Sequence, residues 1–243
     1  MKDAAQAPVI ERVRHELKRR QLTVSAIAPI GPGFVGITFS GEDLADFVSL
    51  SFDDHVKLMF DDSAAHPLRR DYTPRHFDRE RKTLTLEFAL HGHGAASDWA
   101  RNARVGQQLA VGGPRGSFVV PLDLDWHLLA GDTTALPAIA RRLEELPAGA
   151  KVFVAVLADP ADRRPLPSRA EVTLTWADDA DGLIAALQAW TPPAGTGVAW
   201  GGGEAQAMAR VRGVLNDKGV PREWTRVSAY WKRGVADHHE TLE

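Results

Sequence analysis

The chain has 243 residues, of which 44% are hydrophobic and 25% are charged, and its formal net charge is −3. These values are typical of a globular protein of one or two domains, and the small negative charge excludes a general attraction to nucleic acid or to anionic membranes. The sequence contains no cysteine, which excludes disulfides and Cys-ligated iron–sulfur clusters, so any electron transfer would require a bound organic cofactor.

The N-terminal segment is predicted to be helical. Residues 8–21 are charged, and their apolar members Val9, Ile10, Val13 and Leu17 follow the spacing of a short amphipathic helix. We therefore expect a helical extension over residues 1–21. Residues 1–6 lack the apolar core of a signal peptide, and no apolar run approaches the roughly 18 residues needed to cross a bilayer. A cytoplasmic protein without stable membrane insertion is expected.

The next hundred residues, 22–122, have a strand-like pattern. Strands are predicted over residues 22–24, 35–39, 55–60 and 83–90. The last two of these segments alternate between apolar and polar residues, and Gly-Pro turn signals occur at residues 31–33 and 112–114. Many short strands joined by such turns predict an antiparallel β-barrel domain.

The remaining residues, 123–243, alternate between buried strands and helices. Strands are predicted over residues 126–130, 151–157, 172–176, 197–200 and 226–231. One helix is predicted to follow the turn after the first strand and to end at about residue 146, and two more are predicted over residues 182–190 and 204–218. This alternation predicts a second domain with a parallel sheet covered by helices.

One predicted strand carries an unusual group of functional side chains. Residues 70–75, with the sequence Arg-Asp-Tyr-Thr-Pro-Arg, combine two cations, an aromatic ring and a hydroxyl. Arginine binds phosphate, and tyrosine can stack on a flat heterocycle. Taken alone, the same pattern is equally typical of an ordinary barrel strand with surface arginines.

A Gly-rich turn follows at residues 91–94 and opens a helix. Gly94, Ala95 and Ala96 are small enough to let a ligand approach the backbone, and Ser97 can cap the helix or bind a phosphate. A helix N-terminus near an arginine is typical of a pyrophosphate site. A plain capped helix is the structural alternative. Together with residues 70–75, the turn favours a flavin nucleotide held on a barrel, which would place the protein among electron-transfer enzymes.

Two further Gly-rich turns follow predicted parallel strands, at residues 131–135 and 201–204. The carboxyl ends of parallel strands are where such sheets bind ligands, although Gly-rich turns are also common structural devices. His91 and His93 could suggest a metal pair, but the turn has no further ligands nearby, so we expect no metal held by the protein.

These motifs, in their order and spacing, resemble those of the siderophore-interacting protein family, the flavin-dependent ferric-siderophore reductases of the ferredoxin-reductase superfamily. Arg70, Tyr72, Thr73 and Arg75 match the family's Arg-x-Tyr-Thr-x-Arg motif. Residues 91–99 match its His-Gly-x-Gly-Pro-Ala-Ser-x-Trp motif, with Ala95 in place of proline. Residues 113–118, 131–138, 203–205 and 230–234 match further family signatures, with Thr133 in place of a glutamate.

The resemblance implies a six-stranded antiparallel barrel that binds FAD, followed by an α/β domain that binds NADPH or NADH. Tyr72 and Thr73 are the implied catalytic residues, which would pack on the isoalloxazine and bond near its reactive nitrogen. The implied cofactor contacts are Arg70, Tyr72, Thr73, Arg75, His91, Gly92, Gly94, Ala96, Ser97, Gly131, Asp132, Thr133, Thr134, Ala135, Gly203, Glu204 and Trp231.

The resemblance also implies a basic cluster that binds an anionic ferric siderophore. Lys57 and Arg115 would belong to it, with the third charge supplied by Lys232 or Arg233. Reduction of Fe(III) to Fe(II) would then release the iron. Two alternatives stay open at this point: a flavin reductase that exchanges electrons with a ferredoxin or another protein, and a non-catalytic siderophore-binding or iron-sensing protein.

Overall fold

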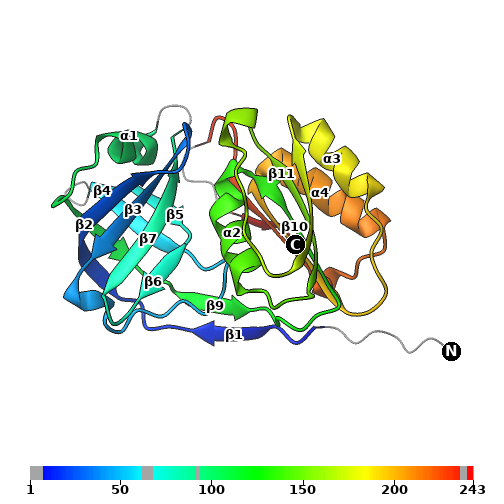
Figure 1. Cartoon of the computed structure of the whole chain (residues 1–243), viewed down its shortest axis with the longest axis horizontal. Coiled ribbons are helices and arrows are strands. Elements are labelled where there is room, and N and C mark those ends of the chain that lie inside the picture. The colour runs from blue at the N-terminus through cyan, green and yellow to red at the C-terminus, as the bar shows by residue number, and fades with distance from the viewer. Residues whose placement is uncertain (1–7, 62–67, 91–93, 236–239, 243) are drawn as a thin grey trace. The chain divides into compact units, whose positions relative to one another are not determined.

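The computed structural model describes residues 8–61, 68–90, 94–235 and 240–242. They form two compact units, Glu11–Val119 and a second unit made mostly of Val120–Glu243. The sequence predicts a domain boundary nearby, between residues 122 and 123. Figure 1 shows the helices and strands of each unit.

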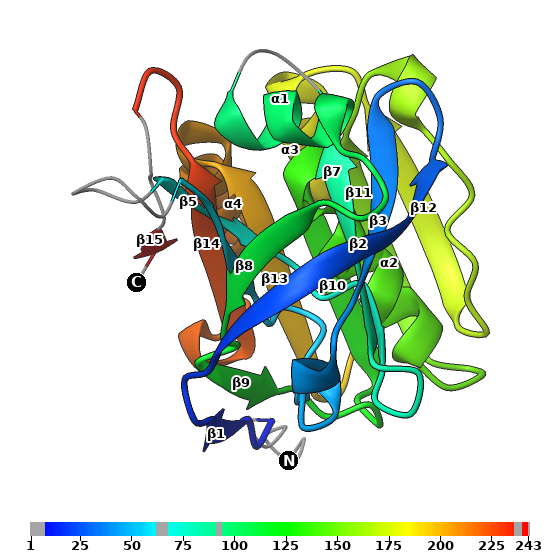
Figure 2. The same ribbon diagram turned by 90° about the vertical axis from the view of Figure 1, so that its left-hand side faces the viewer.

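The N-terminal unit is built mainly from antiparallel strands. Its elements are β1 (Glu11–Arg14), β2 (Arg19–Pro29), β3 (Phe34–Ser40), a 3-10 turn (Glu42–Leu44), β4 (Val56–Asp61), β5 (Leu68–Tyr72), β6 (His76–Asp78), β7 (Thr83–Ala89), α1 (Ala95–Asn102), β8 (Gln108–Gly112) and β9 (Gly116–Val119). Seven of the described strands form one curled sheet in the order β5-β4-β8-β2-β3-β7-β6. Figure 2 shows β2 running between β3 and β8, with α1 near one end of the sheet.

The predicted antiparallel barrel type is confirmed, but the strand count differs from six. β5 pairs with β4 at one edge of the sheet, and β6 pairs with β7 at the other. Only residues 73–75 separate β5 from β6 along the chain. One continuous segment, β5 and β6 together, therefore occupies both edges of the sheet. Counted as one strand, as in a closed barrel, this segment would give six strands; counted as two, it gives the seven of this sheet. Its core contains fully buried aromatic and aliphatic side chains such as Phe39, Leu58 and Phe88.

The predicted N-terminal helix is wrong. Residues 11–14 form β1, which pairs antiparallel with β9, a strand about a hundred residues later in the chain. Two apolar side chains of the supposed helical stripe, Val9 and Leu17, are 79% and 70% exposed, so no apolar helix face is buried. The close pairing depends on Gly116, because a Cβ there would lie 2.6 Å from the Val13 carbonyl oxygen. Local periodicity carries no information about such a distant partner.

The C-terminal unit has the predicted α/β architecture. Its elements are β10 (Trp126–Asp132), a 3-10 turn (Thr133–Ala135), α2 (Leu136–Glu145), β11 (Lys151–Leu157), a second 3-10 turn (Pro160–Asp162), β12 (Glu171–Ala177), α3 (Ala180–Ala189), β13 (Gly197–Glu204), α4 (Ala205–Asp217), a third 3-10 turn (Arg222–Trp224), β14 (Thr225–Trp231) and β15 (Glu240–Leu242). The sheet order is β12-β11-β10-β13-β14-β15. All described pairs are parallel except β14 with β15.

This strand order gives the sheet a topological switch point, and open α/β sheets have a crevice at such a point. The chain leaves β10 toward β11 on one side and later returns to β13 on the other, so the connections diverge at the carboxyl ends of β10 and β13. Side chains of β10, α3 and α4, among them Leu128, Leu183 and Val211, share one buried apolar cluster. Ligands of open α/β sheets bind at such a topological switch point.

Candidate functional site

The two faces of β5 carry different chemistry. Tyr72 lies opposite Val56 and Arg70 opposite Leu58, and both β4 partners are fully buried. Because side chains alternate along a strand, Arg70 and Tyr72 share one face, whereas Asp71 faces the other way together with its own partner Lys57. The predicted flavin residues Arg70 and Tyr72 therefore project from the same side of β5.

Phe88 brings the two predicted flavin motifs together. Its ring centroid lies 4.3 Å from that of Tyr72 on β5 and 5.7 Å from that of Trp99 on α1. Burial raises the pKa of Tyr72 well above its usual range, with the nearby Arg70 acting in the opposite direction. The phenol is therefore protonated and can donate a hydrogen bond. The sequence analysis includes Phe88 only within the predicted strand over residues 83–90, because its contacts with both motifs depend on how β5, β7 and α1 pack.

The residues after Tyr72 leave the strand and are buried. Thr73 is 8% exposed, and Arg75 is 7% exposed with its backbone N–H donating to the Thr85 carbonyl. Arg75 Nε lies 3.1 Å from Glu87 Oε1, in an ion pair that is buried on both sides. Sequence reasoning missed Glu87. Its partner Arg75 thus has a structural role in the sheet, and contact of Arg75 with a cofactor stays a prediction.

The start of α1 presents the backbone N–H groups of its first helical turn. Its N-cap is Gly94, which has no side chain to cap the helix, and Ala95, Ala96 and Ser97 form the first turn. The first N–H groups of any α-helix lack intrahelical acceptors and favour anions. Open space surrounds the position of a Cβ at Gly94. Ser97 is inside the helix and not at its cap, and the predicted contacts His91 and Gly92 lie outside the described residues.

These donors match the chemistry of a flavin nucleotide. A guanidinium and a set of helix amides suit the two charges of a pyrophosphate, and a half-buried phenol ring suits a flat heterocycle. The ring contacts through Phe88 join the strand that carries Arg70 and Tyr72 to the helix that carries the amides. The residues of this unit therefore fit FAD.

The C-terminal unit brings together the two Gly-rich turns at the switch-point crevice. Gly131 on β10 pairs with Gly202 on β13. A Cβ at Gly131 would lie 2.3 Å from the Gly202 carbonyl oxygen, so the two strand ends can approach this closely only with glycine. Thr133, Thr134 and Ala135 follow in a 3-10 turn at the same strand end.

Asp132 links three strand ends. Its carboxylate accepts hydrogen bonds from Thr134 after β10, from the Glu204 backbone at the end of β13 and from the Trp231 indole at the end of β14. The Glu204 carboxylate itself caps α4, because it accepts from the Gln206 and Ala207 backbone N–H groups. Thus Asp132, Glu204 and Trp231, predicted separately along the sequence, lie together.

The predicted basic cluster is divided between the two units. Lys57 and Arg115 belong to the N-terminal unit, and Lys232 and Arg233 to the other. Lys57 Nζ donates to Asp71 Oδ1 at 2.7 Å while its side chain stays 52% exposed. Arg115, Lys232 and Arg233 are also exposed. Each residue is accessible in its own unit, and joint binding of one substrate stays a prediction.

The Arg115 turn is held by a buried polar network. The His15 backbone N–H donates to the Arg115 carbonyl, and the Ser117 hydroxyl donates to Asp54 at 2.6 Å. His15 Nε2 lies 2.8 Å from the same hydroxyl. A serine, a histidine and a carboxylate also occur in hydrolase triads, but here the hydroxyl is 2% exposed and lies between the other two groups. The arrangement ties β1, β9 and the segment before β4 together.

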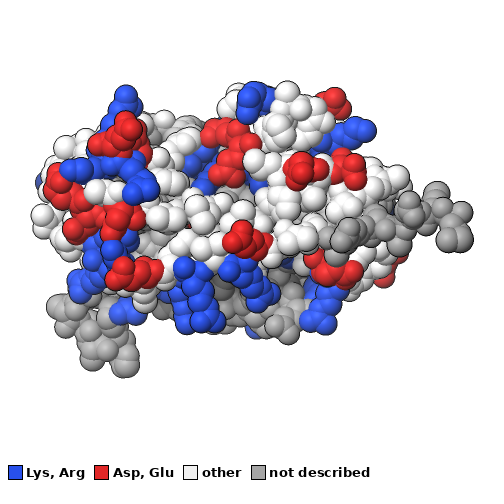
Figure 3. Space-filling model, turned by 90° about the horizontal axis from the view of Figure 1, so that it is seen from below, with Lys and Arg blue, Asp and Glu red and all other residues white. Residues whose placement is uncertain are grey.

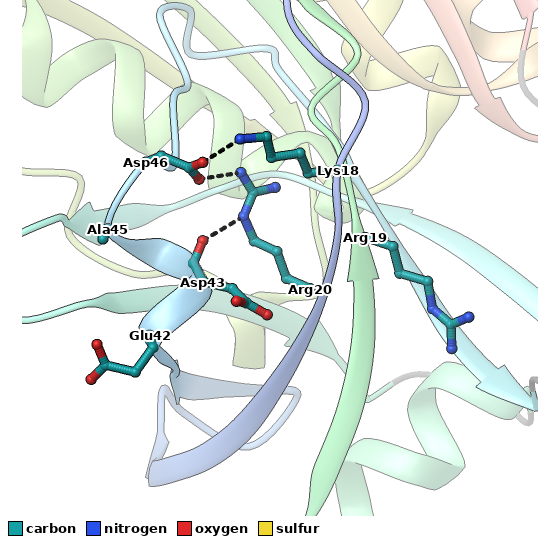
Figure 4. Close-up of a pocket in the computed structure, with 7 residues that line it drawn as sticks. All are labelled: Lys18, Arg19, Arg20, Glu42, Asp43, Ala45 and Asp46. Atoms are coloured by element: carbon teal, nitrogen blue, oxygen red, sulfur yellow. Dashed lines mark hydrogen bonds and ion pairs between the residues drawn. The ribbon is translucent and has the colours of Figure 1, made fainter.

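A polar hollow opens elsewhere on the N-terminal unit (Figure 4). It is lined by Lys18, Arg19, Arg20, Glu42, Asp43, Ala45 and Asp46. Asp46 pairs with both Lys18 and Arg20, and hydrogen bonds from these cations lower its pKa to about 2. Arg20 also donates to the Asp43 and Gly113 carbonyl oxygens. These charged side chains form ion pairs with one another and hydrogen bonds to the backbone, and the contacts anchor the turn after β3 to β2.

In the parts of the chain that the structure describes, no three His, Cys, Asp or Glu side chains are grouped closely enough to hold a metal ion. The histidine pairs at residues 91 and 93 and at residues 238 and 239 lie outside those parts. No described helix has the length and apolar character required to cross a membrane.

Two family models match the chain. The siderophore-interacting FAD-binding domain matches residues 23–67 and 61–118, and the siderophore-interacting protein model matches residues 124–234. The first covers β5 and α1, which carry the flavin-like donors, and the second covers the switch-point crevice.

Individual proteins match over nearly the whole length. The NADPH-dependent ferric-chelate reductase of Escherichia coli (strain K12) is 34% identical over 91% of this chain and 96% of its own. The ferric vibriobactin reductase of Vibrio cholerae is 28% identical over 87% of this chain and 89% of its own. The crystal structure of a siderophore utilization protein from T. fusca superposes with a TM-score of 0.85, at 35% identity, over 95% of this chain and 98% of that one. With both units matched and the flavin-like donors in place, the chain belongs to the siderophore-interacting protein family.

Proposed function

We propose that this protein is a cytoplasmic, FAD-dependent reductase that takes electrons from NADPH or NADH and reduces Fe(III) bound to a siderophore, releasing Fe(II) for iron assimilation. One observation carries the proposal. Phe88 joins the face of β5 that bears Arg70 and Tyr72 to α1, whose first turn presents backbone N–H groups, within the unit matched by the FAD-binding family model.

Different residues of this unit bind different parts of the cofactor. Arg70 and the first-turn amides of α1 hold the pyrophosphate, since both are donors to anions. The Tyr72 ring, supported from behind by Phe88, packs on the isoalloxazine. The Thr73 hydroxyl donates near the reactive ring nitrogen. FAD itself supplies the chemistry, because it accepts a hydride and passes on single electrons, whereas the protein supplies binding and orientation.

The switch-point crevice of the C-terminal unit is the proposed site for the nicotinamide nucleotide. Gly131, Gly203 and the segment between Asp132 and Ala135 line it at the ends of β10 and β13. An arginine after the second strand of such a sheet can accept a 2′-phosphate. Arg163 follows β11 here, where it donates to the Ala158 carbonyl and pairs with Asp178. NADPH is the donor named for the Escherichia coli relative, and it is the donor we favour.

The substrate class follows from iron chemistry and from charge. Lys57, Arg115 and either Lys232 or Arg233 attract an anionic ferric siderophore, although the whole protein has a net charge of −3. One nicotinamide nucleotide gives up two electrons, so each oxidised molecule reduces two Fe(III) to two Fe(II). The related reductases are named for ferric chelates and ferric vibriobactin.

An anaerobic colour cycle tests the proposal. The purified protein loaded with FAD should be yellow, should bleach on addition of NADPH and should regain its colour on addition of a ferric siderophore. A chromogenic Fe(II) chelator should then record two Fe(II) for each NADPH oxidised.

A parallel arm with an oxidised ferredoxin distinguishes the main alternative. Recolouring by ferredoxin but not by a panel of ferric siderophores would replace the proposed substrate with a protein partner. A colourless protein that binds a siderophore without binding FAD would overturn the enzyme assignment altogether.

A further inference from the structure

One buried carboxylate controls the geometry of the switch-point crevice. Asp132 Oδ1 accepts from the Thr134 backbone N–H at 2.9 Å and from the Thr134 hydroxyl at 2.5 Å. Its Oδ2 accepts from the Glu204 backbone N–H at 2.8 Å and from Trp231 Nε1 at 2.9 Å. The side chain thus connects the ends of β10, β13 and β14, which lie side by side in the sheet.

The surrounding backbone is shaped around this carboxylate. Gly203 has a φ of +154°, and a Cβ there would lie 2.7 Å from Asp132 Oδ2. The ladder between β13 and β14 shifts register between Gly203 and Glu204, and the shift sets Glu204 opposite Trp231. A side chain at residue 203 would displace the carboxylate from the Glu204 N–H and the indole.

The exposures of the two partners separate their roles. Asp132 is 6% exposed and its four hydrogen bonds all go to described residues of the protein, so its carboxylate is not available to a ligand. Trp231 is 38% exposed although its indole N–H donates a hydrogen bond to the buried Asp132 carboxylate. A large, partly exposed aromatic ring held by one buried acceptor suits contact with a flat ligand.

We propose that Asp132 is a positioning residue for the nicotinamide nucleotide, which it does not touch, and that it acts by fixing the Trp231 indole and the Gly203–Glu204 turn. This proposal rests on the proposed function, because the nucleotide is the ligand assigned to the crevice. It changes the part expected of Asp132 from a direct cofactor contact to a support beneath Trp231.

Three substitutions distinguish the contributions of the individual hydrogen bonds. Asp132→Ala removes every acceptor. Asp132→Asn keeps one oxygen, and that oxygen should face Glu204 and Trp231, because two obligatory donors lie on that side. The other side has one obligatory donor, the Thr134 backbone N–H, and a Thr134 hydroxyl that can turn and accept from the new amide. Trp231→Phe keeps an aromatic ring but removes the N–H. A matched control is Asp125→Asn at the opposite end of β10, where the carboxylate accepts from the Thr196 backbone N–H.

The first measurement needs no cofactor turnover. In ¹⁵N-labelled protein, the indole N–H resonance that disappears in Trp231→Phe identifies Trp231. We expect this resonance to shift upfield in Asp132→Ala, to move far less in Asp132→Asn and to stay in place in Asp125→Asn. An unmoved resonance in Asp132→Ala would overturn the positioning role.

The second measurement is the affinity for NADP⁺ by calorimetry, with the FAD content checked for each variant. Asp132→Ala and Trp231→Phe should each raise Kd about tenfold, because both remove the hydrogen bond that fixes the Trp231 indole. Because both act through one ring, the double variant should bind no more weakly than Asp132→Ala. Asp132→Asn should recover most of the affinity, and Asp125→Asn should bind like the wild type.

The outcomes separate this inference from the proposed function. Wild-type protein that fails to bind either nucleotide would overturn the crevice assignment and this inference together. Nucleotide binding that is normal in both Asp132→Ala and Trp231→Phe would overturn the inference alone. If Asp132→Ala does not fold, Trp231→Phe carries the test, because its partly exposed ring can change without opening the core. Equal Kd for that variant and the wild type would then contradict the proposal.

Discussion

At the scale of single residues, adjacent side chains on β5 have opposite tasks. Arg70 and Tyr72 share the face that continues through Phe88 toward α1. Asp71, between them in the chain, faces away and binds Lys57. Arg69 is paired with Met59 and is exposed on that second face. The alternation therefore provides a built-in comparison between two neighbouring arginines.

Arg70→Ala should weaken FAD binding much more than Arg69→Ala. A hydrogen bond to a charged group contributes about 1.5–3 kcal/mol, so the Kd for FAD should rise roughly ten- to hundred-fold in Arg70→Ala. Titration of FAD into the apoprotein, followed by flavin fluorescence, measures both constants. Similar losses in the two variants would mean that general positive charge on β5 is sufficient, which would contradict a specific role for Arg70.

At the scale of elements, β10 contributes a different chemistry to each face of its sheet. Trp126, Leu128 and Ala130 enter the apolar cluster shared with α3 and α4. His127 is 1% exposed, and the buried Arg142 of α2 acts on it electrostatically. Burial, then the charge of Arg142, lowers the pKa of His127 to about 3, with the Leu122 backbone acting in the opposite direction. The imidazole is therefore neutral in the folded protein.

The stability of the C-terminal unit should fall as the pH is lowered from about 6.5 toward 3. In the unfolded chain His127 binds a proton near pH 6.5, whereas in the folded chain it stays neutral until about pH 3. The unfolded state thus gains a proton first, and stability falls by up to about 1.4 kcal/mol per pH unit within this window. Urea unfolding at pH 7.5 and pH 5 measures the difference, and His127→Leu should show a smaller one. An identical pH dependence in wild type and variant would exclude His127 as the source.

At the scale of the whole molecule, the proposed function draws on residues of both units. The flavin donors belong to Glu11–Val119, and the switch-point crevice belongs to the other unit. The predicted substrate cations are divided in the same way. Figure 3 shows that Lys and Arg side chains share the displayed face with Asp and Glu, so this surface is not of one sign. Attraction of an anionic chelate must therefore come from local groups of cations.

The rate of reduction of an anionic ferric siderophore should fall as ionic strength rises, and less steeply in the triple variant Lys57→Ala, Arg115→Ala, Lys232→Ala. Salt screens charges over a Debye length of about 10 Å at 0.1 M. The triple variant should reduce its flavin with NADPH at the same rate as the wild type, since the cations act on the other substrate. Asp71→Asn should steepen the salt dependence, because it frees Lys57 from its ion pair. A second triple variant, with Arg233→Ala instead of Lys232→Ala, shows which of these two residues supplies the third cation.

A neutral siderophore is the control for this experiment. Its reduction rate should change little with salt in either protein. Equal salt slopes for wild type and triple variant with the anionic substrate would identify these residues as ordinary surface charges.

Much of this protein can be predicted from the sequence because the relevant chemistry is local. Strand alternation, Gly-rich turns and the order of elements are set by neighbours along the chain, and they indicate the antiparallel unit, the parallel unit and the flavin and strand-end motifs. The residue types in residues 70–75 and 94–97 also indicate anion and ring binding without knowledge of the fold.

The tertiary structure decided what depends on partners far apart in the chain. The pairing of β1 with β9 overrode a helical pattern, because strand pairing through Gly116 needs a segment about a hundred residues away. The Phe88 contacts, the ion pair of Arg75 with Glu87 and the burial of Asp132 beneath Trp231 likewise arise from register and packing. Residue type indicates which bonds a side chain can make, and only the three-dimensional arrangement determines which partners come within reach.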